Sequence, residues 1–162
     1  MTISQAESKA RAGLPFIRWT QGYLPRALMQ RLVPLDAARA RLPAGIGRQK
    51  ISANGVRCEW LIPEDSPPDR ALLYLHGGGF VFGISGLHLQ MVAALAQKLQ
   101  MRALMVDYRL APQHPFPAPL DDCVTACRWL LNAGFPAQGL AIAGDSAGGQ
   151  LTLTTLMKLR DA

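Results

Sequence analysis

The sequence predicts an α/β fold, with a mostly parallel sheet covered by helices and an N-terminal helical segment before it. Three continuous apolar runs, at 71–75, 102–108 and 139–144, have the length of strands that are buried on both faces. A stretch with the spacing of a helix follows each run. Strands that alternate with helices in this way are typical of a parallel sheet with helices on both faces.

The first 45 residues show helical spacing, most clearly in RALMQRLV. Proline ends or kinks a helix, because it lacks a backbone N–H and its ring clashes with the preceding turn. We therefore expect several short helices here, interrupted at Pro15, Pro25, Pro34 and Pro43. Residues 1–45 are predicted to form a helical cap segment, and residues 46–162 to hold the sheet.

The chain from 47 to 63 alternates polar and apolar residues around Asn54-Gly55, a strong hairpin signal because both residues tolerate positive φ. Residues 109–119 contain four prolines and are predicted to be irregular. Helices are predicted at 87–99, 121–134 and 147–160. The predicted order is a hairpin followed by β-α-β-α-β-α.

Composition indicates a globular chain, with 49% hydrophobic and 17% charged residues among 162. No apolar run reaches the roughly 18 residues of a membrane span, and the N-terminus lacks the apolar core of a secretory signal. We therefore expect a cytoplasmic protein. The net charge of +6 comes from residues 1–50, which contain nine Lys and Arg but only two acidic residues. Because these cations are dispersed among apolar residues, a solvated helix face is favoured over a nucleic-acid or membrane patch.

The three cysteines, Cys58, Cys123 and Cys127, are an odd number, which argues against a disulfide framework. Cys123 and Cys127 would share one face of a helix, so a metal pair is conceivable. No other Cys or His lies near them in sequence. Buried free thiols are therefore favoured, and no metal is expected.

GDSAG, at 144–148, lies between the third apolar run and the last predicted helix and fits G-x-S-x-G. A steric requirement explains the glycines at 144 and 148, because an abrupt strand-to-helix corner leaves little space for a side chain two residues before and after it. Ser146 would then project its hydroxyl at a helix N-terminus, where negative charge is favoured. The alternative is a glycine-rich helix start capped by Ser146 or Asp145. The lysine and spacing of a phosphate-binding loop are missing.

HGGG, at 76–79, directly follows the first apolar run. A serine that transfers acyl groups needs N–H donors directed at the oxygen of its tetrahedral intermediate. Ala147 can supply one donor, and a neighbouring backbone loop must supply the others. Glycines allow the close approach and the φ values that such a loop requires. The alternative is a glycine-rich turn without a function. Parallel sheets bind ligands at the carboxyl ends of their strands, which here are 76–79, 107–109 and 144–146.

Three blocks together resemble the hormone-sensitive-lipase-like carboxylesterases, which are α/β-hydrolases with an N-terminal helical cap. These blocks are HGGGF (76–80), DYRLAPQHPFPA (107–118) and GDSAGG (144–149), and the resemblance covers essentially the whole chain. It implies that Ser146 is the nucleophile and that Gly78, Gly79 and Ala147 donate the oxyanion-hole N–H groups. It also implies a small-molecule ester substrate and no cofactor.

The resemblance further implies supporting roles for residues beside the site. His76 would brace the glycine loop, with Asp145 as a second support, rather than act as the base. Residues 107–109 would form the scaffold of the proline-rich loop beneath the site.

The histidine and the acid of a catalytic triad do not follow Ser146 in the expected way. In α/β-hydrolases the chain order is Ser, then Asp or Glu, then His. Sixteen residues follow Ser146, with Asp161 as their only acid and no histidine. Members of the resembled family are roughly twice as long as this chain. We therefore expect the N-terminal half of the fold, without the triad Asp and His, and a free edge on the strand at 139–143 that invites self-association.

Two functions therefore stand side by side. One is a serine carboxylesterase or lipase-type hydrolase that cleaves short- to medium-acyl esters through an acyl-enzyme at Ser146. The other is a catalytically incompetent fragment or binding module that lacks the triad Asp and His. The scaffold also permits amide cleavage, because fold alone does not determine the reaction.

Overall fold

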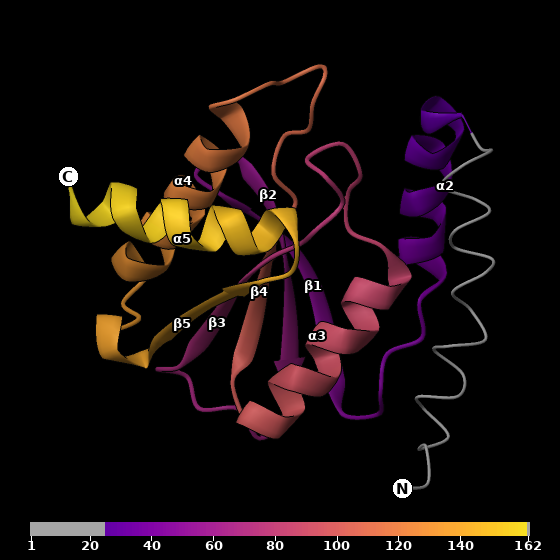
Figure 1. The fold of residues 1–162 in the computed structure, drawn as a ribbon. Coiled ribbons are helices and arrows are strands. Elements are labelled where there is room, and N and C mark those ends of the chain that lie inside the picture. The colour runs from indigo at the N-terminus through magenta and orange to yellow at the C-terminus, as the bar shows by residue number, and fades with distance from the viewer. Residues whose placement is uncertain (1–24, 162) are drawn as a thin grey trace, which may run out of the picture.

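A computed structural model describes residues 25–161 of the chain, which form a five-stranded sheet between helices (Figure 1). The strands are β1 (Ile46–Ala53), β2 (Val56–Pro63), β3 (Ala71–Leu75), β4 (Arg102–Val106) and β5 (Leu140–Gly144). The helices are α2 (Arg26–Arg39), α3 (Gly86–Leu99), α4 (Ala118–Asn132) and α5 (Ala147–Arg160), with a short 3₁₀ turn η1 (Ala137–Gly139) before β5. The predicted order of a hairpin followed by β-α-β-α-β-α is confirmed.

The strand order across the sheet is β1-β2-β4-β3-β5. β3 pairs in parallel with both β4 and β5, whereas β1 pairs with β2 and β2 with β4 in antiparallel fashion. The predicted hairpin turn is confirmed, since Asn54 and Gly55 have φ of 51° and 90°. Among the described residues β5 has one neighbouring strand, so it lies at an edge of the sheet, as expected.

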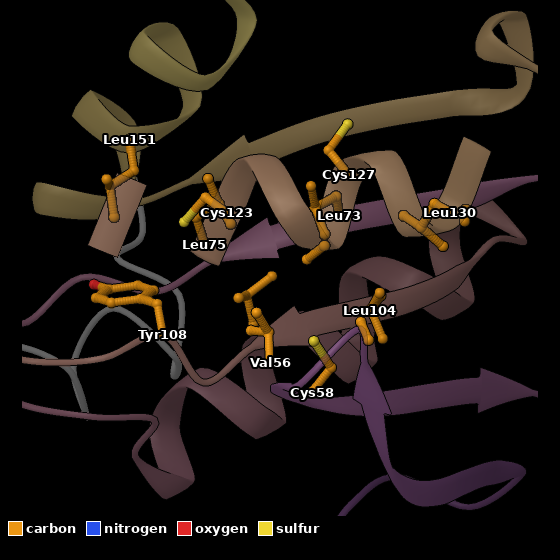
Figure 2. Close-up of a cluster of buried hydrophobic side chains, with 14 of the residues drawn as sticks. Val56, Cys58, Leu73, Leu75, Leu104, Tyr108, Cys123, Cys127, Leu130 and Leu151 are labelled. Atoms are coloured by element: carbon orange, nitrogen blue, oxygen red, sulfur yellow. The ribbon is translucent and has the colours of Figure 1, made fainter. Parts of the chain in front are cut away.

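Helices cover both faces of the sheet, which explains the continuous apolar run of β3, buried at all five residues. Leu72 and Tyr74 pack with α3 on one face, and α2 lies beside α3 (Figure 1). Leu73 and Leu75 point to the other face and pack with α4 and α5, where Leu151 joins the same cluster (Figure 2). This second cluster lies directly beneath the start of α5.

Two predictions about proline were wrong. Pro34 was expected to interrupt a helix, but it lies inside α2. Tertiary contacts hold α2 across the proline: Gln30 donates to the Val81 carbonyl, and the Asp36 carboxylate accepts from the Gly86 N–H. α4 begins inside the stretch predicted to be irregular, because prolines in a first helical turn lose no intrahelical hydrogen bond. The other helices predicted before residue 25 lie outside the described residues.

All three cysteines are buried free thiols, as predicted. Burial raises the pKa of Cys58 to about 12, so this thiol stays protonated at neutral pH. Residues 25–161 contain no group of three or more His, Cys, Asp or Glu side chains that could hold a metal ion. No helix in this part of the chain is long and apolar enough to cross a membrane.

Candidate active site

Ser146 lies at a sharp corner between β5 and α5. Its backbone has φ 48° and ψ −117°, a conformation that L-residues rarely adopt and that costs on the order of 1–3 kcal/mol. The residue is exposed, although Ala147 and Gly148 directly after it are buried. The corner therefore presents the hydroxyl-bearing residue at the N-terminus of α5 and buries the turn beneath it.

The glycines on either side of this corner have no space for a side chain. A Cβ on Gly148 would overlap the carbonyl oxygen of Leu75 and lie 2.6 Å from the Leu75 carbonyl carbon. A Cβ on Gly144 would lie 2.5 Å from that same oxygen. The steric reason predicted for the two glycines is thus confirmed, because the helix start presses directly on the end of β3.

The Asp145 carboxylate joins three elements at this edge of the sheet. Its Oδ1 accepts hydrogen bonds from the Gly77 N–H at 2.8 Å and from the Tyr74 hydroxyl at 3.0 Å. Its Oδ2 lies 3.5 Å from Nε2 of His88. Burial alone raises the pKa of Asp145, but these partners, led by the Gly77 amide, outweigh burial and hold the pKa below its usual value. Asp145 therefore remains an anion that links the corner to the glycine loop.

The glycine loop takes a backbone path that few other residues could follow. Gly78 and Gly79 have φ of 115° and 61°, and Phe80 continues this with φ 64°. The Gly78 carbonyl accepts from the N–H groups of Val81 and Phe82, and a Cβ on Gly78 would lie 2.6 Å from the Phe82 oxygen. A Cβ on Gly79 would meet nothing within 4 Å. The loop is thus closed on the side of Gly78 and open at Gly79.

His76 is fully buried beneath this loop. Its Nδ1 donates to the Gly77 carbonyl at 2.7 Å, and its ring stacks on Tyr108 with centroids 4.2 Å apart. The Tyr108 hydroxyl donates to the His76 carbonyl at 2.6 Å. Burial lowers the pKa of His76 to about 4, so the ring is neutral at physiological pH. These contacts suit a residue that supports the loop, which is the role expected from the resemblance.

The proline-rich loop is fixed to the same edge. The Ala111 N–H donates to the Phe80 carbonyl at 2.8 Å, which joins this loop to the glycine loop. The Arg109 guanidinium pairs with the buried Asp122 carboxylate of α4 at 2.7 Å. The carboxyl ends of β3, β4 and β5 therefore meet in one hydrogen-bonded unit, as their positions in the sequence predict.

Sequence reasoning missed the parts played by His88 and Tyr74. His88 lies at the start of the helix predicted at 87–99, where it forms a capping box with Ser85 and also reaches Asp145. The Ser85-x-x-His88 spacing at the start of α3 is a signal for the cap but not for the contact with Asp145. No sequence signal predicts the bond from Tyr74 to Asp145, because Tyr74 lies within an apolar run and is expected to serve only in packing.

Comparison with known proteins agrees with this geometry. A model of the alpha/beta hydrolase fold family matches residues 72–162. The chain belongs to this family. Relatives of this α/β-hydrolase include Esterase LipU of Mycobacterium tuberculosis, 38% identical over 86% of this chain and 48% of the relative. Human hormone-sensitive lipase is 36% identical over 83% of this chain and 13% of the relative.

Solved structures extend the likeness from the sequence to the backbone. A hormone-sensitive lipase from a metagenome library has a TM-score of 0.82 and 32% identity, covering 93% of this chain and 52% of that one. The α/β-hydrolase thus spans about half the length of the metagenomic lipase and of Esterase LipU. The predicted fold and the resemblance to hormone-sensitive-lipase-like esterases are confirmed.

Proposed function

We propose that this chain carries the nucleophile and the oxyanion hole of a serine carboxylic ester hydrolase. The hydrogen bond from the Gly77 N–H to the Asp145 carboxylate is the observation that carries the proposal. It fixes the glycine loop beside Ser146, where N–H donors for an oxyanion are needed. Relatives that bear names such as esterase, acetyl-hydrolase and carboxylesterase support the same reaction class.

In the proposed mechanism, the Ser146 Oγ attacks the ester carbonyl carbon as its proton passes to a base. The N–H groups of Gly78, Gly79 and Ala147 donate to the oxygen that becomes negative. The intermediate then expels the alcohol and leaves an acyl group on Ser146, which water removes. The base is not His76, because its ring is fully buried beneath the glycine loop and burial lowers its pKa to about 4, which makes it a weak proton acceptor. A histidine and an acid from outside the 162 residues complete the triad.

Two further features belong to this proposal. The helix α2 supports the cap predicted for residues 1–45, because its residues line a cavity of about 540 Å³ against β1 and β2. The free edge of β5 and the exposed Leu153 and Met157 of α5 favour self-association. Sedimentation velocity of the chain at rising concentration would show a dimer if this is correct, and a constant monomer if it is not.

Reaction at Ser146 is tested with a fluorophosphonate and p-nitrophenyl acetate. We expect the intact mass of the chain to rise by one phosphonyl group, located on Ser146 by peptide mapping. Ser146→Ala should abolish this labelling, whereas Ser52→Ala, at an exposed serine of β1, should leave it unchanged. Equal labelling of wild type and Ser146→Ala would contradict the proposal that Ser146 is the nucleophile.

Turnover separates the esterase from its alternative, a catalytically incompetent fragment or binding module. Without a triad histidine the chain should label slowly and hydrolyse p-nitrophenyl acetate several orders of magnitude more slowly than a complete triad enzyme. Fast turnover that is lost in Ser146→Ala would refute the incompetent-fragment alternative. Comparing p-nitrophenyl acetate with p-nitroacetanilide decides between ester and amide cleavage.

A further inference from the structure

His88 is a largely buried histidine whose two ring nitrogens have different neighbours. It lies in the first turn of α3, and its side chain is 15% exposed. Its Nδ1 lies against Ser85 at the start of that helix, and its Nε2 faces the carboxylate of Asp145, just before α5. Because α3 and α5 cover opposite faces of the sheet (Figure 1), His88 connects the two helices at the edge where the glycine loop lies.

The contacts with Ser85 determine which ring nitrogen of His88 carries the proton. The Ser85 backbone N–H lies 3.1 Å from Nδ1, and a backbone N–H can only donate. The Ser85 hydroxyl oxygen accepts from the His88 N–H and lies 2.9 Å from the same Nδ1, so its own proton can also be donated there. Nδ1 is therefore an acceptor without a proton, and the proton of the neutral ring lies on Nε2.

The Nε2 proton of His88 faces the Asp145 oxygen that accepts no hydrogen bond from the glycine loop. Oδ1 of Asp145 accepts from the Gly77 N–H and the Tyr74 hydroxyl. Oδ2 lies 3.5 Å from His88 Nε2, and within residues 25–161 no other side chain pairs with this oxygen. A Cβ on Gly77 would overlap Oδ2, so the carboxylate also packs against the loop itself. The His88 contact thus holds the carboxylate in the rotation that presents Oδ1 to Gly77.

The start of α3 is itself fixed, which makes His88 a rigid support. The Gly86 N–H donates to the Asp36 carboxylate of α2 at 2.7 Å. Leu89, the residue after His88, is fully buried and packs against the sheet. A side chain that its own helix already holds in place loses little further rotamer freedom when it contacts another group. His88 can therefore orient the Asp145 carboxylate at a small entropic cost.

We propose that His88, with its proton on Nε2, is a positioning residue for the oxyanion hole. It orients the Asp145 carboxylate, and that carboxylate in turn holds the Gly77 amide and the glycine loop in place. This inference rests on the proposed function, because it assumes that the loop donates to an oxyanion formed at Ser146. Donors that are held in position before the reaction stabilise a developing charge without reorganising. Loss of the His88 donor should therefore loosen the loop and slow reaction at Ser146, with the fold kept.

Two substitutions at His88 separate its contact with Asp145 from its part in the helix cap. His88→Glu and His88→Gln both keep the cap, because a side-chain oxygen of either residue accepts from the Ser85 N–H in a capping box. Gln also provides an amide N–H that can face Asp145, whereas ionised Glu provides no donor and adds a negative charge there. Gln90→Glu is the matched control, because it adds the same charge at an exposed position of α3.

Hydrogen exchange at the Gly77 amide and the rate of Ser146 labelling by the fluorophosphonate are measured for each chain. In the labelling step the Ser146 Oγ bonds to phosphorus, fluoride leaves and the hydroxyl proton passes to buffer. At neutral pH, His88→Glu should speed the exchange and slow the labelling, each by about threefold or more, with the urea midpoint close to that of wild type. His88→Gln and Gln90→Glu should keep both rates within about twofold of wild type.

Nitrogen NMR of the histidine rings tests the position of the proton in the wild-type chain. The His88 signals, identified by their loss in His88→Gln, should show a protonated Nε2 and an unprotonated Nδ1 at neutral pH. A proton on Nδ1 would overturn the inference, because that nitrogen could then no longer accept from the Ser85 N–H. This measurement does not depend on how well any substituted chain folds.

The outcomes distinguish failure of this inference from failure of the proposed function. Wild-type rates of Gly77 exchange and Ser146 labelling in His88→Glu would overturn the inference and leave the proposed function standing. Faster exchange with unchanged labelling would also overturn it, and so would equal losses in His88→Gln and His88→Glu, which indicate a role in the helix start alone. If Ser146 is not labelled in wild type, the proposed function fails, and with it the positioning role in the reaction.

Discussion

Replacing Gly148 with alanine tests the close contact between α5 and β3 most directly. The new methyl group would overlap the Leu75 carbonyl oxygen, and it would lie 2.6 Å from the Leu75 carbonyl carbon and 2.7 Å from the His76 oxygen. All three are backbone atoms, so no side chain can rotate away to make room. The corner at Ser146 or the pairing of β3 with β5 must therefore distort.

The magnitude follows from the number and kind of atoms that the methyl group meets. Overpacking a core usually costs 1–3 kcal/mol, with part of the strain relieved by moving side chains. Because that relief is missing here, we expect Gly148→Ala to lower the free energy of unfolding by about 3 kcal/mol or more. Gly149 provides the matched control, since a Cβ there lies 3.5 Å from its nearest neighbour, the Gly144 oxygen. Gly149→Ala should be neutral or stabilising by up to about 1 kcal/mol, because alanine favours the helix.

Urea unfolding of the 162-residue chain, followed by circular dichroism, measures both variants. The midpoint for Gly148→Ala should fall sharply, and that for Gly149→Ala should stay or rise, with similar slopes. A Gly148→Ala midpoint that matches wild type would refute the close approach of α5 to β3. Equal losses in the two variants would show that the helix start tolerates no alanine for reasons unrelated to Leu75.

Three other predictions concern the corner and the loop. Ser146→Gly should be more stable to urea than Ser146→Ala by about 1 kcal/mol, because glycine adopts φ 48° without strain; equal stability would contradict the strained corner. The His76 pKa falls from 6.5 to about 4 on folding, so the unfolded chain binds a proton that the folded chain does not. The free energy of unfolding should therefore decrease by on the order of 2–3 kcal/mol from pH 7 to pH 4.5, and an equally steep decrease in His76→Phe would rule out His76 as its source. Asp145→Asn should speed hydrogen exchange at the Gly77 amide about tenfold, since a charged acceptor becomes neutral; unchanged protection would show that this bond does not hold the loop.

The sheet was predictable because its strands carry strong local signals. β3 has the same bounds as the apolar run 71–75. A strand that is buried on both faces has apolar residues at every position, so the first and last apolar residues mark its ends. The corner at Ser146 was also predictable from a local signal. A sharp strand-to-helix turn requires glycine two positions before and after it, and Gly144 and Gly148 stand there. Pro34 was misjudged, since the contacts that hold α2 across it come from residues about fifty positions further along the chain.

The contacts that assemble the site gave no such signal. Gly77 and Asp145 are 68 positions apart, and neither their spacing nor their types predict a hydrogen bond between them. The sequence indicated that both lie at the carboxyl ends of parallel strands, which places them at the same edge but not in contact. The register of β3 on β5, with Leu75 opposite Gly144, brings Gly77, two residues after Leu75, within bonding distance of Asp145, the residue after Gly144.

This register has a consequence for how the proposed site would work. The Asp145 anion fixes the glycine loop through Gly77, β3 through Tyr74 and the start of α3 through His88. All of these residues belong to the first 145 of the chain, so the geometry of the loop does not depend on the residues that supply the base. Donors that are fixed in advance stabilise a developing charge without reorganising during the reaction. The proposed oxyanion hole and the proposed base are therefore separable, and Ser146 labelling measures the first without the second.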